Sequence, residues 1–223
     1  MPEPRASSLL LRSVPLFASL TEAQSEVIAR TMHRRIVRRG QPIINAGDRP
    51  RCLHMIVSGS AQAVLNGRDG NNIILSVLNA GDYFCEMEII EDLPISTSIV
   101  ARESCDVLML PRAQFNHCLE ENHPMSMMVL RGMAARLREA DERFGSLAME
   151  DVDARLAKFL IQEARWVDGA RVVTCRFSKS DIGRMIGASR ERVSRVMKEM
   201  QVRGYLEERG DSILLRERIL SLA

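Results

Sequence analysis

Short apolar runs alternating with glycine-containing turns fill residues 36–111. The runs lie at 43–44, 53–57, 61–65, 73–78 and 107–110, and the turns at 46–48, 58–59, 67–70 and 80–82. Short strands recurring about every 8–12 residues are typical of an all-β sandwich or barrel. Before them, Thr21 is a candidate N-cap for a helix over 22–33 with Val27, Ile28 and Met32 on one face. The pattern predicts a helix followed by a β domain.

An apolar repeat with a mean period of 3.5 residues follows Pro124 and reaches residue 148. Its members are Ser126, Leu130, Met133, Leu137, Ala140, Phe144 and Leu147. Alternating spacings of four and three residues are typical of a helix packed along another helix. A helix lying on its own β domain is the alternative, but the strict alternation favours two chains. We therefore predict a homodimer, with the members from Leu130 onward at its interface.

The last third of the chain predicts a small helical domain with a hairpin. Asp151 and Asp153 are candidate caps for a helix that carries Leu156, Phe159, Leu160 and Trp166. A short strand at 172–177, two short helices and a hairpin around Gly210 follow. The expected fold class is α+β. The expected order of parts is a β domain, a long dimer helix and a small helical domain with a hairpin.

The formal charge of +2 conceals an uneven distribution. Residues 1–150 have 16 basic and 18 acidic side chains, net −2, whereas residues 151–223 have 15 and 11, net +4. A locally basic segment on a nearly neutral chain is typical of a nucleic-acid-binding module. A solvated helix face without a partner is the alternative reading.

Residues 177–197 have the pattern of two short helices joined by a tight turn. Ser178 and Ser189 are candidate N-caps, and Asp181 suits a capping box less well than Glu does. Gly183 is small where the helices must cross, and Gly187 can adopt positive φ at the turn. The expected buried positions are Ile182, Ile186, Val193, Val196, Met197 and Met200.

The outer face of the second helix carries chemistry suited to DNA. We expect Arg190, Glu191, Arg192 and Arg195 on this face. Arg offers two donors to guanine, and a carboxylate accepts from the cytosine amino group. Ser178, Lys179 and Ser189, with the helix N-terminal amides, suit phosphate contacts. Double-stranded DNA is therefore the expected partner.

Several other classes of protein are disfavoured. No apolar stretch approaches the roughly 20 residues of a membrane span, so we expect a cytoplasmic protein without a membrane partner. The chain lacks HExxH, GxSxG and Walker motifs, so we do not expect an enzyme. Five widely spaced cysteines without a CxxC motif favour buried reduced thiols over a zinc or iron–sulfur site. We expect no metal ligands.

Residues 182–195 resemble the helix-turn-helix signature of the Crp/Fnr (catabolite activator and fumarate-nitrate regulator) family of bacterial transcription factors. Residues 147–152 resemble that family's hinge, and the motifs at 47–48, 57–60 and 78–82 resemble its β-roll. The resemblance implies a cyclic-nucleotide-binding-type, jelly-roll-like β-roll sensor at 1–121, a dimerisation helix and hinge at 122–150, and a winged helix-turn-helix at 151–223. A dimer and, for an activator, contact with RNA polymerase are further implications. It also implies that Arg190, Glu191 and Arg195 read TGTGA-like half-sites. Arg192 stands where the best-known member of the family has a small polar residue, which allows an added phosphate contact or a shifted base preference.

The expected ligand-binding residues depart from the cAMP-binding pattern. In cAMP-binding members a Gly-Glu pair and a later Arg-Ser pair hold the nucleotide, whereas this chain has Cys85-Glu86 and Ser96-Thr97. Losing a charge-assisted hydrogen bond from arginine weakens phosphate binding by about 1.5–3 kcal/mol. On the long helix, Ala140 and Asp141 replace the two hydroxyls that face adenine. Ordinary cAMP sensing is disfavoured.

Three other readings of the sensor remain open. Cyclic di-GMP is preferred over cAMP, because Asp141 suits the guanine edge and residues 30–51 carry a net charge of +6. These arginines otherwise pair with the acidic stretch 82–92. A regulator without a ligand comes next. Haem is least favoured, with Cys85 and Met87 as its ligands. A nucleotide-binding adaptor without a DNA function is the alternative class.

Overall fold

The computed structural model describes residue 11 and residues 14–67, 72–174 and 177–222. The chain forms two compact units, Met1–Arg136 and Leu137–Ala223, and the division falls within the long helix α5 (His123–Met149). The predicted boundaries at 121/122 and 150/151 stay predictions.

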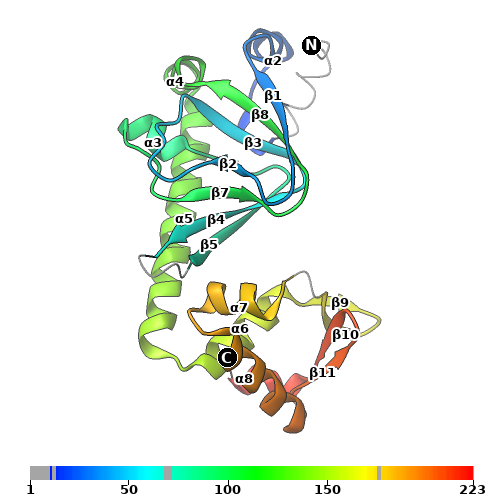
Figure 1. Ribbon diagram of the computed structural model, residues 1–223. Coiled ribbons are helices and arrows are strands. Elements are labelled where there is room, and N and C mark those ends of the chain that lie inside the picture. Colours follow the sequence, from blue (N-terminus) through cyan, green and yellow to red (C-terminus); the bar gives the residue numbers. More distant parts are fainter. Residues whose placement is uncertain (1–10, 12–13, 68–71, 175–176, 223) are drawn as a thin grey trace. The chain divides into compact units, whose positions relative to one another are not determined.

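Two four-stranded antiparallel sheets build the N-terminal unit (Figure 1). One has the strand order β1-β8-β3-β6 and the other β2-β7-β4-β5. The strands are β1 (His33–Val37), β2 (Pro42–Ile44), β3 (Cys52–Ser58), β4 (Ser60–Asn66), β5 (Asn72–Asn79), β6 (Tyr83–Phe84), β7 (Ser98–Ala101) and β8 (Cys105–Pro111). The helices are η1 (Pro15–Phe17), α2 (Glu22–Ala29), α3 (Glu86–Glu91), α4 (Arg112–Glu121) and the first part of α5. The predicted β domain is confirmed.

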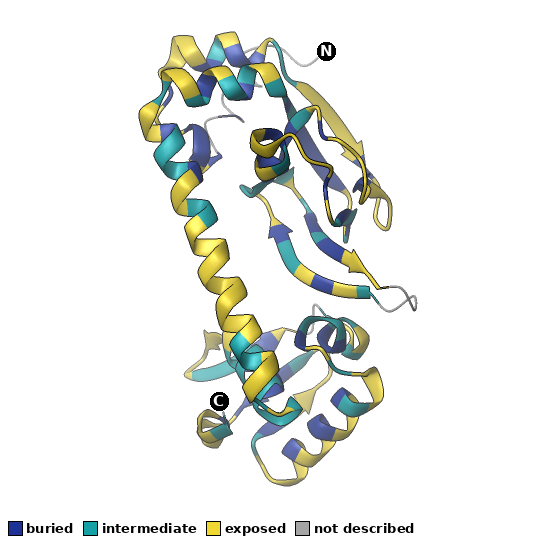
Figure 2. Cartoon of the chain, turned by 90° about the vertical axis from the view of Figure 1, so that its left-hand side faces the viewer, coloured by how far each residue is buried: buried dark blue, intermediate teal, exposed yellow. Residues whose placement is uncertain are grey.

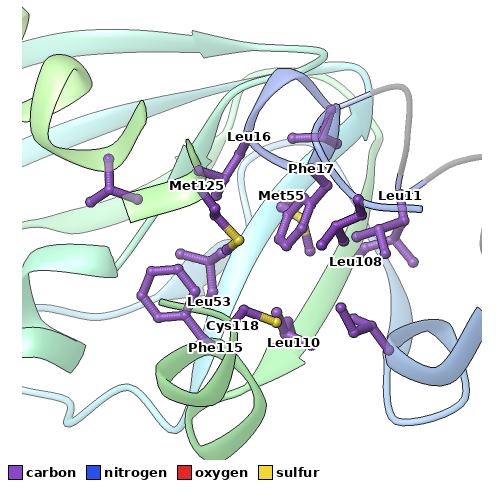
Figure 3. Packing of buried hydrophobic residues seen from close by; sticks show 14 of the residues in the cluster. Leu11, Leu16, Phe17, Leu53, Met55, Leu108, Leu110, Phe115, Cys118 and Met125 are labelled. Atoms are coloured by element: carbon purple, nitrogen blue, oxygen red, sulfur yellow. The ribbon is translucent and has the colours of Figure 1, made fainter. Parts of the chain in front are cut away.

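Alternation along β3 divides the buried side chains of this unit into two cores. Leu53 and Met55 face a core made with η1, α2, α4 and the start of α5 (Figure 3). Ile56 faces a second core that receives side chains from both sheets. Successive residues of a strand point to opposite faces, so one strand serves both cores.

The first predicted helix is shorter than expected. Thr21 caps α2 as predicted, but the helix ends at Ala29 and β1 begins at His33. Val27 is 61% exposed, whereas Ile28 is buried. The predicted grouping of Val27, Ile28 and Met32 on one helical face was wrong, because Val27 is exposed while Ile28 is buried, and Met32 lies beyond the end of α2.

Helix α5 confirms the long helix predicted from the apolar repeat. Met125 and Val129 are buried and Met133 packs partly against the core of its own unit. The other apolar members of the repeat lie open, with Leu130 57%, Leu137 64% and Phe144 76% exposed, and the middle of the helix is coloured exposed in Figure 2. None of the described helices is long and apolar enough to cross a membrane.

The C-terminal unit packs three helices on a four-stranded antiparallel sheet of order β11-β12-β10-β9. Its elements are α6 (Val152–Glu163), β9 (Arg165–Val167), β10 (Ala170–Thr174), α7 (Lys179–Ile186), α8 (Arg190–Val202), β11 (Leu206–Arg209), β12 (Ser212–Leu215) and η2 (Glu217–Leu222). The predicted helix pair and final hairpin are confirmed. Trp166 lies on β9 and is 68% exposed, so its placement on a helix was wrong. The end of the predicted strand at 175–176 lies outside the described residues.

Candidate DNA-binding surface and sensor site

A capping box starts α7. Ser178 Oγ accepts from the Asp181 backbone N–H at 3.1 Å, and the Asp181 carboxylate accepts from the Ser178 backbone N–H at 3.1 Å. Burial opposes ionisation of Asp181, but hydrogen bonds from Ser178 and the neighbouring Arg184 lower its pKa overall. Asp therefore completes a capping box here, which the sequence reading rated less favourable than Glu.

The turn between α7 and α8 depends on two glycines. Gly187 has φ +67° and ends α7, a conformation that residues with a Cβ adopt at a cost. A Cβ at Gly183 would lie 2.5 Å from the Ala188 backbone oxygen. Only glycine lets the turn approach α7 this closely, as predicted.

Helix α8 presents its inner and outer faces as the sequence indicates. Ser189 caps it, and Val193, Val196, Met197 and Met200 are buried. Arg190, Glu191 and Arg195 are exposed. Hydrogen bonds to its own backbone and to Ser189 lower the pKa of Glu191, which keeps this carboxylate an acceptor. At 100° per residue, Ser194 and Lys198 share the outward face and are also exposed. The sequence reading missed both, although the helical period alone identifies them.

Two of the basic side chains among the expected DNA contacts are paired with acidic residues of the protein. Arg192 projects to the side of α8, where its Nη2 donates to Asp153 Oδ1 at 3.0 Å. Its side chain is 41% exposed, so it lies at the edge of the outward face, and its expected DNA contact stays a prediction. Lys179 Nζ lies 3.1 Å from Glu208 Oε1 on β11.

A buried ion pair lies at the start of α3. Glu86 is 2% exposed, and Arg136 on α5 donates to its Oε1. Arg136 also donates to the Tyr83 carbonyl at 2.9 Å, and its guanidinium carbon lies 5.4 Å from the centre of the Tyr83 ring. Glu86 Oε2 is buried without a hydrogen-bond partner among the described residues. Burial raises the pKa of Glu86, against the opposing effect of Arg136. One carboxylate oxygen of this ion pair is therefore a buried acceptor without a donor among the described residues.

Arg136 and Tyr83 are absent from the sequence-based site. Arg136 lies one position before Leu137 in the apolar repeat, so its period places it beside the seam but does not reveal its partner. Tyr83 directly precedes the Phe84-Cys85-Glu86 motif. Gly132 allows Tyr83 to approach α5, since a Cβ there would lie 2.8 Å from the Tyr83 hydroxyl.

The other expected ligand-binding residues have different environments. Cys85 is 3% exposed and adopts a left-handed backbone with φ +73°. Burial, with Glu88 and Glu86 nearby, raises the pKa of its thiol. Met87 and Ser96 are exposed, and Thr97 is half-buried. Among the described residues, no group of three His, Cys, Asp or Glu side chains is arranged to hold a metal ion.

On α5, Ala140 and Asp141 are exposed. Both lie in the C-terminal unit, whereas Glu86 and Arg136 lie in the N-terminal unit.

The arginine-rich segment 30–51 is partly neutralised. Arg34 makes a two-point contact with Asp106, with its Nε 2.8 Å from Oδ1 and its Nη2 2.5 Å from Oδ2. Arg49 donates to the Asp92 carbonyl at 2.9 Å. The alternative reading, in which these arginines pair with the acidic stretch 82–92, holds for Arg49, whose Nη1 also lies 3.9 Å from Asp92 Oδ1. Arg34 pairs with Asp106, which lies outside that stretch.

A β-roll sensor joined to a winged helix-turn-helix defines the class of ligand-responsive transcription regulators. Residues 34–122 match the cyclic nucleotide-binding domain, and residues 154–220 match the Crp-like helix-turn-helix domain. The chain belongs to the Crp/Fnr family of transcription regulators.

Curated relatives and solved structures agree with this assignment. The chain is 30% identical to the cAMP-activated global transcriptional regulator Vfr of Pseudomonas aeruginosa over 190 residues, covering 82% of this chain and 89% of Vfr. It is 28% identical to the cAMP-activated regulator CRP of Salmonella typhimurium over 177 residues, covering 78% and 84%. The c-di-GMP responsive regulator CLP of Xanthomonas campestris has a similar fold, with a TM-score of 0.73, 22% identity and coverage of 87% and 99%. A CooA mutant from Carboxydothermus hydrogenoformans has a TM-score of 0.78, 19% identity and coverage of 96% and 93%.

Proposed function

We propose that this regulator binds a TGTGA-like palindrome as a homodimer and that a cyclic nucleotide in the β-roll alters its DNA affinity. The observation that carries the DNA half of the proposal is the outward face of α8. Arg190, Glu191 and Arg195 are exposed there on a helix whose opposite side is buried. Arg and Glu are suited to G·C pairs in the major groove.

The exposed stripe of α5 supports the homodimer. Leu130, Leu137, Phe144 and Leu147 recur at helical spacing, and each is at least half exposed in the single chain. A second copy of the same helix would bury these side chains in a coiled coil. A two-fold dimer presents two copies of α8, which would enter successive major grooves about 34 Å apart.

The DNA proposal is tested with Arg195→Ala in the full-length chain. Binding is measured to a duplex carrying a TGTGA-like palindrome and to a scrambled duplex of equal length. The substitution should weaken palindrome binding about 5- to 150-fold, corresponding to 1–3 kcal/mol, and relax the preference at one G·C pair. Lys198→Ala is the matched control and should weaken binding to both duplexes about equally. If the native chain binds both duplexes alike, sequence-specific recognition is refuted.

For the effector, we propose cyclic di-GMP ahead of cAMP. Ser96 stands where cAMP-binding relatives have the phosphate-holding arginine, and it is exposed. Glu86 Oε2 supplies an acceptor for a hydroxyl or a guanine amino group. Isothermal titration with cAMP, cGMP and cyclic di-GMP tests this order. An absorption spectrum tests for haem, and the absence of heat and of a Soret band would favour a regulator without a ligand.

Arg136 gives the effector a route to α5. It lies on α5 and contacts both Glu86 and the Tyr83 carbonyl, so a ligand that competes for Glu86 changes how α5 is held. The resulting shift in DNA affinity equals, at most, the difference in effector affinity between the two states. RNA polymerase becomes a partner where the bound regulator activates transcription, and the cytoplasm is the proposed location.

A further inference from the structure

Arg192 is fixed at the beginning of α8 by both its backbone and its side chain. Its backbone N–H donates to Ser189 Oγ at 3.1 Å, and its guanidinium donates to Asp153 Oδ1 at 3.0 Å. Arg192 lies about 100° around the helix from Glu191, toward α6 and away from the outward-facing Ser194 and Lys198. A side chain held there is poorly placed to reach DNA on the outward face.

The first turn of α6 holds both sides of the helix-turn-helix turn. Asp151 caps this turn by accepting from the Ala154 N–H at 2.8 Å. Asp153 binds Arg192 at the start of α8. Two residues further on, Arg155 donates to the Glu150 carbonyl at 2.8 Å and to the Gly187 carbonyl at 3.5 Å. The first turn of α6 thus contacts both Gly187, which ends α7, and Arg192 in the first turn of α8.

We propose that Arg192 is a positioning residue for the recognition helix, acting through Asp153 rather than by contact with DNA. The proposal rests on the proposed function, in which α8 reads bases. Arg190 and Glu191 immediately precede Arg192, so a rotation of this turn moves both base-reading side chains. Two-donor recognition of a base requires the donors to be within about 0.5 Å and 10–20° of their ideal placement. The Asp153 contact supplies that orientation.

A double-mutant cycle in the full-length chain tests the pair. The variants are Arg192→Gln, Asp153→Asn and the two combined, each measured with the palindromic and scrambled duplexes at several salt concentrations. Each single change should weaken palindrome binding about two- to fivefold, the size expected for a half-exposed ion pair. The double variant should bind the palindrome no more weakly than either single variant. In all three variants, the affinity for the scrambled duplex and the salt slope should not change. Lys198→Gln is the matched control and should reduce the salt slope by about one per subunit.

A phosphate contact would give a different pattern and would overturn the proposal. Arg192→Gln would then weaken both duplexes and lower the salt slope as Lys198→Gln does, while Asp153→Asn would leave binding unchanged or tighter. Hydrogen exchange without DNA provides a second readout. Both single changes should speed exchange of the Arg192 and Val193 amides; unchanged exchange in Asp153→Asn would also overturn the proposal. Failure of the proposed function would be recognised separately, because the native chain would then bind the palindromic and scrambled duplexes with equal affinity.

Discussion

Substituting Gly183 with Ala should destabilise the C-terminal unit. The new Cβ would lie 2.5 Å from the Ala188 carbonyl oxygen, and a comfortable contact needs roughly 1 Å more. The obstacle is backbone, and it belongs to the turn whose Ala188 N–H donates to the Gly183 carbonyl at 2.9 Å. Overpacking of this kind costs about 1–3 kcal/mol or more, whereas replacing a helical Gly by Ala gains about 1 kcal/mol. Because the obstacle is backbone rather than a flexible side chain, we expect a cost toward the upper end of this range and a net loss of up to about 2 kcal/mol.

Urea unfolding followed by tryptophan fluorescence measures this effect. Trp166 is the only tryptophan and lies on β9, so its emission reports on the unit that contains the substitution. Gly145→Ala in α5 is the matched control, because among the described residues no atom outside the neighbouring backbone of α5 lies within 4 Å of its added Cβ. It should stabilise the helix by about 0.5–1 kcal/mol. If Gly183→Ala unfolds at the same urea concentration as the native chain or higher, the argument from close approach is refuted.

Three further predictions concern buried and paired charges. Burial and a nearby arginine lower the pKa of His54 to about 4 from an ordinary 6.5, so stability present above pH 6.5 should fall by up to about 3 kcal/mol toward pH 4. His54→Phe should flatten this dependence, measured by hydrogen exchange in β3; equal slopes would contradict it. Arg136→Met leaves Glu86 buried and unpaired, so at neutral pH it should destabilise the β-roll by about 1–3 kcal/mol, more than Glu86→Gln does in urea unfolding followed by circular dichroism. Glu208→Gln frees Lys179 and removes a negative charge, so binding to scrambled DNA should tighten with a steeper salt dependence; weaker binding would argue against a phosphate contact by Lys179.

Local signals explain why much of the DNA-binding surface was predictable. The N-caps at Ser178 and Ser189, the turn at Gly187 and the buried face of α8 all depend on residues within one or two helical turns of each other. The apolar repeat of α5 is equally local, and the helix it predicts is present. Its first members proved less uniform, because Met133 packs partly against its own β domain.

The sequence by itself therefore determined the helix-turn-helix, its caps and turn, and the exposure of Arg190, Glu191 and Arg195 on α8. Only the tertiary structure decided which charges are paired. Arg136 meets Glu86 across 50 residues of sequence, and Arg192 meets Asp153 across 39. The helical period predicts the direction in which a side chain points, but it does not predict which residue of another element contacts that side chain. The same limit applied to Trp166, whose position on β9 depends on pairing with β10 and not on any short-range apolar period.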